Sequence, residues 1–258
     1  MYKKFKVRAV YIPTNRKRTE TLIAKDEEEL IERLKNSDFK EPFDIEEIFN
    51  ESTDRQLEYA KDLGIKVPKD ASLEDVSALI SRNVDGDSLN PNPELIEYAV
   101  DKGLYFSKYI GKKALYNLIY ESLSLKDRIA FFCFSVYRHL SDDRQGNLDK
   151  HRHKNLFYEF AESEINNDKF LKSLGKYTGE DIRFFGTLKF PDGGVTYGGS
   201  VNTIAFKTCA LFLCKKLSLK LVTTKKVNSN KNNEGGWCSV LIIAISIIIT
   251  IFVVCKFT

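Results

Sequence analysis

The residue types with the greatest capacity for chemistry are gathered in one polar stretch, residues 139–153. The stretch holds all three histidines of the chain and three carboxylates, namely His139, Asp142, Asp143, Asp149, His151 and His153. A His-x-His pair beside carboxylates can ligate zinc or another divalent ion and activate water for hydrolysis. One hypothesis is therefore a metal-dependent hydrolase that uses His139, Asp143, His151 and His153.

The charges around these residues favour a second interpretation. Five basic residues alternate with the candidate ligands: Arg138, Arg144, Lys150, Arg152 and Lys154. Their charge opposes the binding of a cation, and no further ligand group stands elsewhere at a diagnostic spacing. A solvated loop of mixed charge explains the stretch without a site, so the favoured interpretation has no catalytic residue, no metal and no cofactor.

The cysteines and glycine pairs give no stronger site. Five cysteines show no framework spacing, and Cys209 and Cys214 would face apart on a helix, which favours free buried thiols. Cys238 and Cys255 are candidates for acylation. The glycine pairs at 193–194 and 198–199 lack the strand–loop–helix context of a phosphate-binding loop, so they are interpreted as turns.

An internal repeat is the most informative feature of the polar part. Residues 57–80 and 96–119 align without gaps at an offset of 39, and eight positions are identical, including Tyr59/Tyr98. Each copy predicts a helix, a glycine stop at Gly64 or Gly103, an extended stretch and a second helix. Ser72 is the expected N-cap of one of these second helices.

The first copy, TDRQLEYAKDLGIKVPKDASLEDVSALISR over residues 53–82, resembles the helix–extended–helix class that includes SAP-like and LEM-like modules. Residues 94–121 match the same skeleton. The resemblance implies tandem modules of a class whose SAP-like members often bind DNA, whereas LEM-like members bind proteins and can occur in membrane-anchored chains.

Charge decides how much of that expectation to adopt. Residues 54–82 carry five basic and six acidic residues, and residues 94–121 carry four of each, whereas phosphate binding favours a basic excess. Lys108, Lys112 and Lys113 near Gly111 can still form a small positive spot at a helix start, which can hold a phosphate. Tyr105 and Tyr109 offer a further contact surface. Protein contact or scaffolding is the favoured role, and nucleic acid stays an alternative.

Flanking elements follow from periodicity. Residues 1–50 predict a ββαβ module, with strands at 5–12, 19–24 and 43–49 and a helix capped by Asp26. Residues 124–220 predict a helical domain, with a central apolar helix at 125–140, a helix at 155–177, a hairpin within 184–197 and a helix at 201–217. Residues 221–236 are an expected basic flexible linker.

Residues 237–255 hold no charge, proline or glycine over nineteen positions. This length can cross a hydrocarbon core of about 30 Å, so the sequence predicts a single C-terminal transmembrane helix and a bilayer as partner. The basic flank predicts that the bulk lies in the cytoplasm. Five lysines are expected to contact the membrane surface: Lys215, Lys216, Lys220, Lys225 and Lys226.

The expected fold class is thus α+β and predominantly helical, ending in a membrane helix. The expected function is non-enzymatic: a tail-anchored protein that presents a protein-interaction, or alternatively DNA-binding, module at a membrane surface. No small-molecule substrate is inferred.

Overall fold

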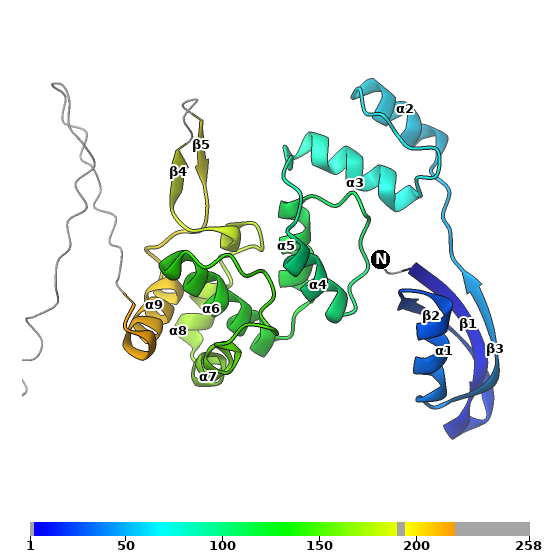
Figure 1. Cartoon of the computed structure of the whole chain (residues 1–258), viewed down its shortest axis with the longest axis horizontal. Coiled ribbons are helices and arrows are strands. Elements are labelled where there is room, and N and C mark those ends of the chain that lie inside the picture. The colour runs from blue at the N-terminus through cyan, green and yellow to red at the C-terminus, as the bar shows by residue number, and fades with distance from the viewer. Residues whose placement is uncertain (1–2, 190–193, 220–258) are drawn as a thin grey trace, which may run out of the picture. The chain divides into compact units, whose positions relative to one another are not determined.

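The computed structural model describes residues 3–189 and 194–219 of the 258-residue chain (Figure 1). All of these belong to one compact unit, residues 1–222. The expected linker 221–236 and apolar segment 237–255 lie outside the described residues, as do Lys220, Lys225, Lys226, Cys238 and Cys255.

A three-stranded antiparallel sheet opens the chain. Its strands are β1 (Lys3–Tyr11), β2 (Arg16–Ala24) and β3 (Phe39–Glu47), in the order β2-β1-β3, with a 3-10 turn η1 (Ile12–Thr14) after β1. Helix α1 (Glu27–Lys35) lies along one face (Figure 1). That face is apolar because alternate residues of β1 point to it, and Phe5, Val7 and Leu30 are buried there. Asp26 caps α1, as the sequence predicts.

Two helix–extended–helix copies follow. The first consists of α2 (Asp54–Asp62) and α3 (Leu73–Val84), and the second of α4 (Pro93–Asp101) and α5 (Lys112–Ser122). Gly64 and Gly103 end the first helix of each copy at φ values of 71° and 70°, a conformation that favours glycine. Ser72 is the N-cap of α3, as the sequence predicts, and it forms a capping box with Asp75. The repeat predicted from the sequence is therefore present as structure.

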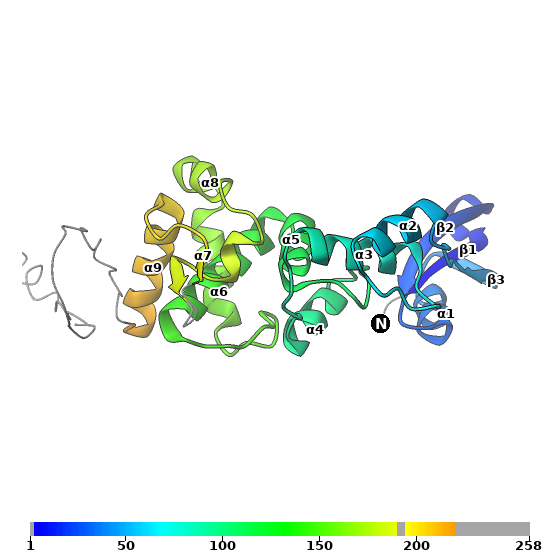
Figure 2. The ribbon, with the colours of Figure 1, turned by 90° about the horizontal axis from the view of Figure 1, so that it is seen from above.

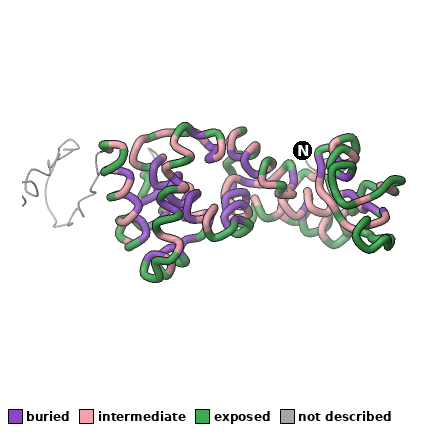
Figure 3. Tube along the Cα trace, turned by 90° about the horizontal axis from the view of Figure 1, so that it is seen from below, coloured by how far each residue is buried: buried purple, intermediate pink, exposed green. Residues whose placement is uncertain are grey.

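The two copies differ in how deeply they are buried. The first packs around a cluster of only three buried residues, Ala60, Ala71 and Val76. The second joins the main core of the chain, which also contains the helices that follow it. Buried positions, purple in Figure 3, are correspondingly denser in the helical region than near the end marked N.

Helix α6 (Leu125–Ser141) is the centre of the main core. Nine consecutive residues from Ile129 to Tyr137 are buried, which confirms the prediction of a helix that is apolar on nearly all faces. Helices α7 (Lys154–Glu164) and α9 (Ile204–Leu217) pack against it, and α8 (Asp168–Leu174) packs against α9 (Figure 2). Phenylalanine rings fill the spaces between these helices, for example Phe132 against Phe170 at 6.4 Å between centroids.

One local prediction needs adjustment, and another is confirmed. The single helix expected at 155–177 is two helices, because the Asn167 side chain accepts a hydrogen bond from the Phe170 amide and starts α8 anew. The expected hairpin is present as β4 (Thr187–Lys189) and β5 (Val195–Tyr197), preceded by a 3-10 turn η2 (Asp181–Arg183). Most of its turn, residues 190–193, lies outside the described residues.

The expected fold class is wrong as a whole. The described residues form a mixed helix-and-strand structure whose nine helices include none that is long and apolar enough to traverse a bilayer. The longest, α6, has 17 residues and carries Lys126, Asp127 and Arg128 in its first turn. About 20 predominantly apolar residues are needed for a membrane span, so the predicted transmembrane helix is not found in the part of the chain that is described.

Candidate functional site

A cavity of about 530 Å³ lies between the two copies of the repeat. Its walls come from α3, from the loop after α3, from the start of α5 and from the turn at η2. The charged side chains that line it are Arg82, Asp85, Asp87, Lys113 and Glu180. The volume falls within the range of about 300–1,000 Å³ that is usual for small-ligand sites.

Two small side chains, both serines, line the α3 side of the cavity. Ser77 and Ser81 of α3 line the cavity, and the repeat register pairs them with Tyr116 and Tyr120 of α5. Both tyrosines are buried. A cavity remains in the first copy because the hydroxymethyl groups occupy much less volume than the phenol rings.

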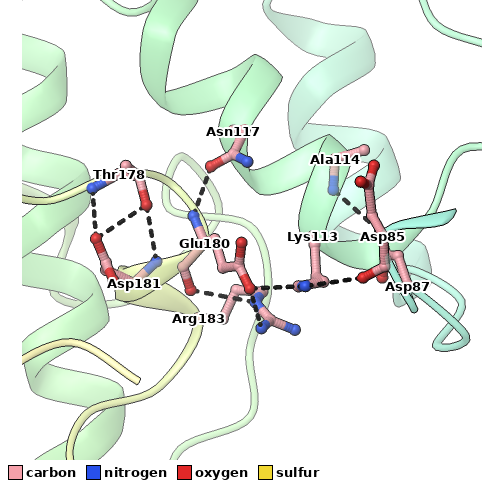
Figure 4. Close-up of polar contacts among 9 residues, drawn as sticks. All are labelled: Asp85, Asp87, Lys113, Ala114, Asn117, Thr178, Glu180, Asp181 and Arg183. Carbon is pink, nitrogen blue, oxygen red and sulfur yellow. Dashed lines mark hydrogen bonds and ion pairs between the residues drawn. The ribbon is translucent and has the colours of Figure 1, made fainter. Parts of the chain in front are cut away.

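A buried aspartate fixes one wall of the cavity. Asp87, which is 3% exposed, accepts a hydrogen bond from the Ala114 amide through Oδ2 at 3.1 Å (Figure 4). It thereby caps α5, whose N-cap residue Gly111 has no side chain to do so. A Cβ at Gly111 would lie 2.0 Å from that Oδ2. Glycine at this position is therefore required by the close approach of Asp87.

Of the three lysines predicted as a phosphate site, Lys112 and Lys113 lie at this helix start, and Lys108 lies in the extended stretch before it. Lys113 Nζ lies 2.8 Å from Glu180 Oε1 and donates to the Asp85 carbonyl at 3.2 Å, and Lys108 pairs with Asp70 at 3.4 Å. Burial, and then the charges of Arg138 and Arg183, lower the pKa of Lys112. A phosphate at this helix start would have to displace the Asp87 carboxylate, so the anion position that the sequence indicated is filled by the chain itself.

The turn at η2 holds Glu180 in place. Asn117 accepts a hydrogen bond from the Glu180 amide at 2.6 Å, and Arg183 donates to the Glu180 carbonyl at 3.1 Å (Figure 4). Gly179 allows the turn to approach α5 closely, because a Cβ there would lie 2.2 Å from the Tyr116 carbonyl oxygen. The position of Glu180 is thus set by hydrogen bonds to its own backbone amide and carbonyl.

The histidine cluster does not converge on one point. His151 is buried and both of its ring nitrogens are engaged: the His153 amide donates to Nδ1 at 3.0 Å, and Nε2 faces Asp143 Oδ2 at 3.2 Å. Since Nδ1 accepts, Nε2 carries the proton and donates to Asp143. The stretch is therefore not the solvated loop that the sequence suggested, because His151, Asn147 and Leu148 are buried.

His139 lies apart from the other two histidines. Its ring contacts Phe185 and Phe206, at 5.6 and 5.8 Å between centroids, whereas His151 and His153 contact Tyr137. Burial lowers the pKa of His139. Within residues 3–189 and 194–219, no group of three or more His, Cys, Asp or Glu side chains is arranged to hold a metal ion.

The remaining predicted contact residues are largely occupied. Lys4 lies over the Tyr105 ring at 4.1 Å, and Lys108 lies 5.2 Å from the Tyr109 ring. Lys216 pairs with Glu159 at 2.6 Å, and Lys215 is exposed on α9. Contact of Lys215 with a membrane surface stays a prediction.

A surface that the sequence analysis did not single out lies on α2. Tyr98 is fully buried and stacks on Phe131 of α6 with 5.3 Å between centroids, whereas the equivalent Tyr59 is 48% exposed. Glu97 pairs with Lys150 and accepts from Asn147 at 3.1 Å. The equivalent Glu58 is exposed, with no side-chain partner in the described part of the chain. Comparing the two copies position by position identifies this surface.

Comparisons with known proteins found no match. No family model matches the chain, and neither a curated protein nor a solved structure matches it.

Proposed function

We propose that this chain is a non-enzymatic protein-interaction module whose first repeat copy binds a segment of a partner protein. The single observation that carries the proposal is the contrast between Tyr59, 48% exposed, and Tyr98, fully buried at the same repeat position. The second copy is covered by α6 and the loop that follows it. The first copy has no such cover within the described residues.

The second copy also indicates what the partner segment looks like. An aromatic ring of a helix, Phe131, stacks on Tyr98, and the loop after that helix supplies Lys150 and Asn147 to Glu97. A partner that binds the first copy in the same way presents an aromatic side chain to Tyr59 and a basic side chain to Glu58. Aromatic anchors with a charged pair beside them are typical of the centres of protein interfaces.

Charge favours a protein partner over nucleic acid. The lysines that would carry phosphate contacts are paired within the chain, Lys108 with Asp70 and Lys113 with Glu180. The start of α5 already holds the Asp87 carboxylate. Each copy also carries nearly equal numbers of acidic and basic residues, whereas affinity for a phosphate backbone depends on a basic excess.

Site-specific photo-crosslinking tests the proposal. A benzoylphenylalanine is placed at Tyr59 in the full-length chain, and the matched control carries it at Tyr197, an aromatic residue that is 74% exposed on the hairpin. We expect a discrete protein adduct from position 59 that is absent from position 197, joined through a helical segment with an aromatic and a basic residue. Glu58→Lys should weaken that adduct at least about tenfold through like-charge repulsion.

The contradicting results are equally definite. Equal labelling from positions 59 and 197, or an adduct that persists with Glu58→Lys, would show that the first copy has no specific partner. An adduct to nucleic acid would transfer the proposal to the DNA-binding alternative.

A further inference from the structure

Charge is unevenly distributed over the three-stranded sheet that opens the chain. Residues 3–19 contain seven basic residues and no acidic one. Along most of β1 these cations are paired with acids of β3: Lys3 lies 2.8 Å from Glu47, and Arg8 lies 3.1 Å from Asp44. Most of the remaining positive charge therefore lies at the other end of the sheet, where β1 turns into β2.

Four exposed basic residues lie there, and we call them the basic end of the sheet: Arg16, Lys17, Arg18 and Lys40. Except for Arg18, their side chains make no hydrogen bond, ion pair or ring contact within the described residues. Two acids lie nearby, Asp38 and Glu41, and Glu41 is already paired with Lys35 at 3.5 Å. The basic end therefore has a clear excess of positive charge.

Strand register fixes the spacing of two of these cations. Lys17 of β2 and Lys40 of β3 both stand opposite Val10 of β1, one on each side of it. Directly paired residues of antiparallel strands project from the same face, and neighbouring strands lie about 4.8 Å apart, so the two Cα atoms are about 10 Å apart. This face is the one opposite α1, because Val7 and Ala9 of β1 are buried on the other.

Aromatic and backbone contacts hold the basic end in a defined shape. The rings of Tyr11 and Phe39 join β1 to β3 with 5.5 Å between centroids, and the Arg18 guanidinium lies 3.9 Å over the Tyr11 ring. The Asn15 amide donates to the Ile12 carbonyl at 3.2 Å and closes the turn. Cations on an ordered scaffold lose less conformational freedom on binding than cations on a flexible tail.

We propose that the basic end of the sheet binds the phosphate backbone of duplex nucleic acid. It has the basic excess that both repeat copies lack, and contacts from lysine and arginine to phosphate supply most of such affinity. The spacing of about 10 Å between Lys17 and Lys40 is close to the width of about 12 Å of the major groove, which phosphates border on both sides.

Two other anionic partners fit this surface less well. Single strands bind by stacking their bases on aromatic rings, whereas the face opposite α1 presents basic, threonine and aliphatic side chains along β1 and β2. A lipid surface favours several exposed apolar side chains beside the cations, and Ile12 is the only large one exposed in the described turn. The inference goes beyond the proposed function, because it concerns a surface other than the first repeat copy.

Fluorescence anisotropy of a labelled DNA duplex, titrated with the full-length protein at several salt concentrations, tests the inference. We expect saturable binding that weakens linearly with salt on a logarithmic plot. The triple variant Arg16→Gln, Lys17→Gln, Lys40→Gln should weaken binding at low salt at least about tenfold. It should also make the slope shallower by about 2.7, which is about 0.9 for each phosphate contact removed.

A matched control removes the same charge elsewhere. Lys169→Gln, Lys172→Gln, Lys176→Gln neutralises three exposed lysines in and just after α8, and it should leave both affinity and slope unchanged. Tyr59→Ala should also leave duplex binding unchanged, so failure of this inference is distinguishable from failure of the proposed protein interaction. Circular dichroism confirms that each variant is folded.

Three results would overturn the inference. The first is the absence of saturable duplex binding at low salt. The second is an equal loss of affinity in the two triple variants, which would show a general attraction by net charge. The third is a preference for another anion: tighter binding to the single strand of the same sequence, or cosedimentation with phosphatidylserine vesicles that depends on the basic end while duplex binding does not.

Discussion

Substitution of Gly111 tests whether a distant carboxylate caps α5. An added Cβ would lie 2.0 Å from Asp87 Oδ2, 2.3 Å from its Cγ and 2.9 Å from its Cβ. The backbone at Gly111 has φ −78° and ψ 164°, which any residue adopts. The cost of Gly111→Ala therefore comes from expelling Asp87 and not from backbone strain.

The loss in the free energy of unfolding caused by Gly111→Ala can be estimated from the structure. Expulsion breaks the 3.1 Å bond from the Ala114 amide to the carboxylate, and a hydrogen bond to a charged group contributes about 1.5–3 kcal/mol. Replacing glycine by alanine restricts the unfolded chain and returns about 0.4–1 kcal/mol. We expect the free energy of unfolding to fall by about 1–2 kcal/mol, which lowers Tm by about 2–8 °C for a unit of this size.

A double-mutant cycle separates the clash from other effects. Asp87→Gly removes all three atoms that the new carbon would meet, so Gly111→Ala should cost nothing further in that background. The coupling energy should be about 1–2 kcal/mol. Gly111→Ser in the same background supplies a local N-cap and should recover about 1 kcal/mol.

Urea unfolding followed by far-UV circular dichroism measures the four free energies, and hydrogen exchange of the Ala114 amide reports the cap directly. Additive costs in the cycle, or a harmless Gly111→Ala in the parent chain, would refute the assignment of Asp87 as the cap. So would an Ala114 amide that exchanges at the same rate with and without Asp87.

Three further predictions follow from burial. Tyr98→Ala should lower the free energy of unfolding by about 3–5 kcal/mol. Tyr59→Ala, at the same repeat position, should change it by about 0.5 kcal/mol or less. Equal effects of the two substitutions in urea titrations would contradict the comparison of the copies. Tyr98→Phe should be neutral or stabilising by up to about 1 kcal/mol. The reason is that the Tyr98 hydroxyl is buried without a hydrogen-bond partner among the described residues. A clear loss of stability would instead show that this hydroxyl is hydrogen-bonded. Burial lowers the pKa of His139 below its usual 6.5, so its contribution is fully present above that value and is lost as pH falls toward the folded pKa. His139→Gln should accordingly flatten the pH dependence of Tm between about pH 7 and 5, and an unchanged slope would exclude His139 as its source.

Sequence reasoning succeeded where the deciding interactions are local. Asp26 and Ser72 cap helices through bonds to amides three residues away, and Gly64 and Gly103 end helices by their own conformation. Such chemistry is complete within a few residues, so a single sequence contains it. The start of α8 at Asn167 has the same kind of local signal, because the Asn-Asn-Asp run contains residues that commonly cap helices.

The site depends on contacts between residues that are distant in the sequence, so the sequence indicated only part of it. A helix that begins Gly-Lys-Lys, without a side-chain cap or an acid in its first turn, signals a place for an anion. Nothing local in the sequence shows that Asp87, 24 residues before Gly111, places its carboxylate at this helix start. The environment of His151 was hidden in the same way, because Phe134 and Phe157, which contact its ring, lie on separate helices.

The two copies of the repeat indicate where function has diverged from packing. Some residues that each copy needs to form its own fold are the same in both, as in Ala60/Ala99 and Gly64/Gly103. The positions that differ most in burial or size are those that face α6 in the second copy and solvent or the cavity in the first. Tyr59 and Ser81 lie outside the core of the first copy, which consists of Ala60, Ala71 and Val76, whereas Ser77 links α3 to α2 by accepting a hydrogen bond from Gln56 at 2.9 Å. The first copy exposes Tyr59 at the repeat position where the second copy buries Tyr98, and this difference is the reason why we propose that binding occurs at the first copy.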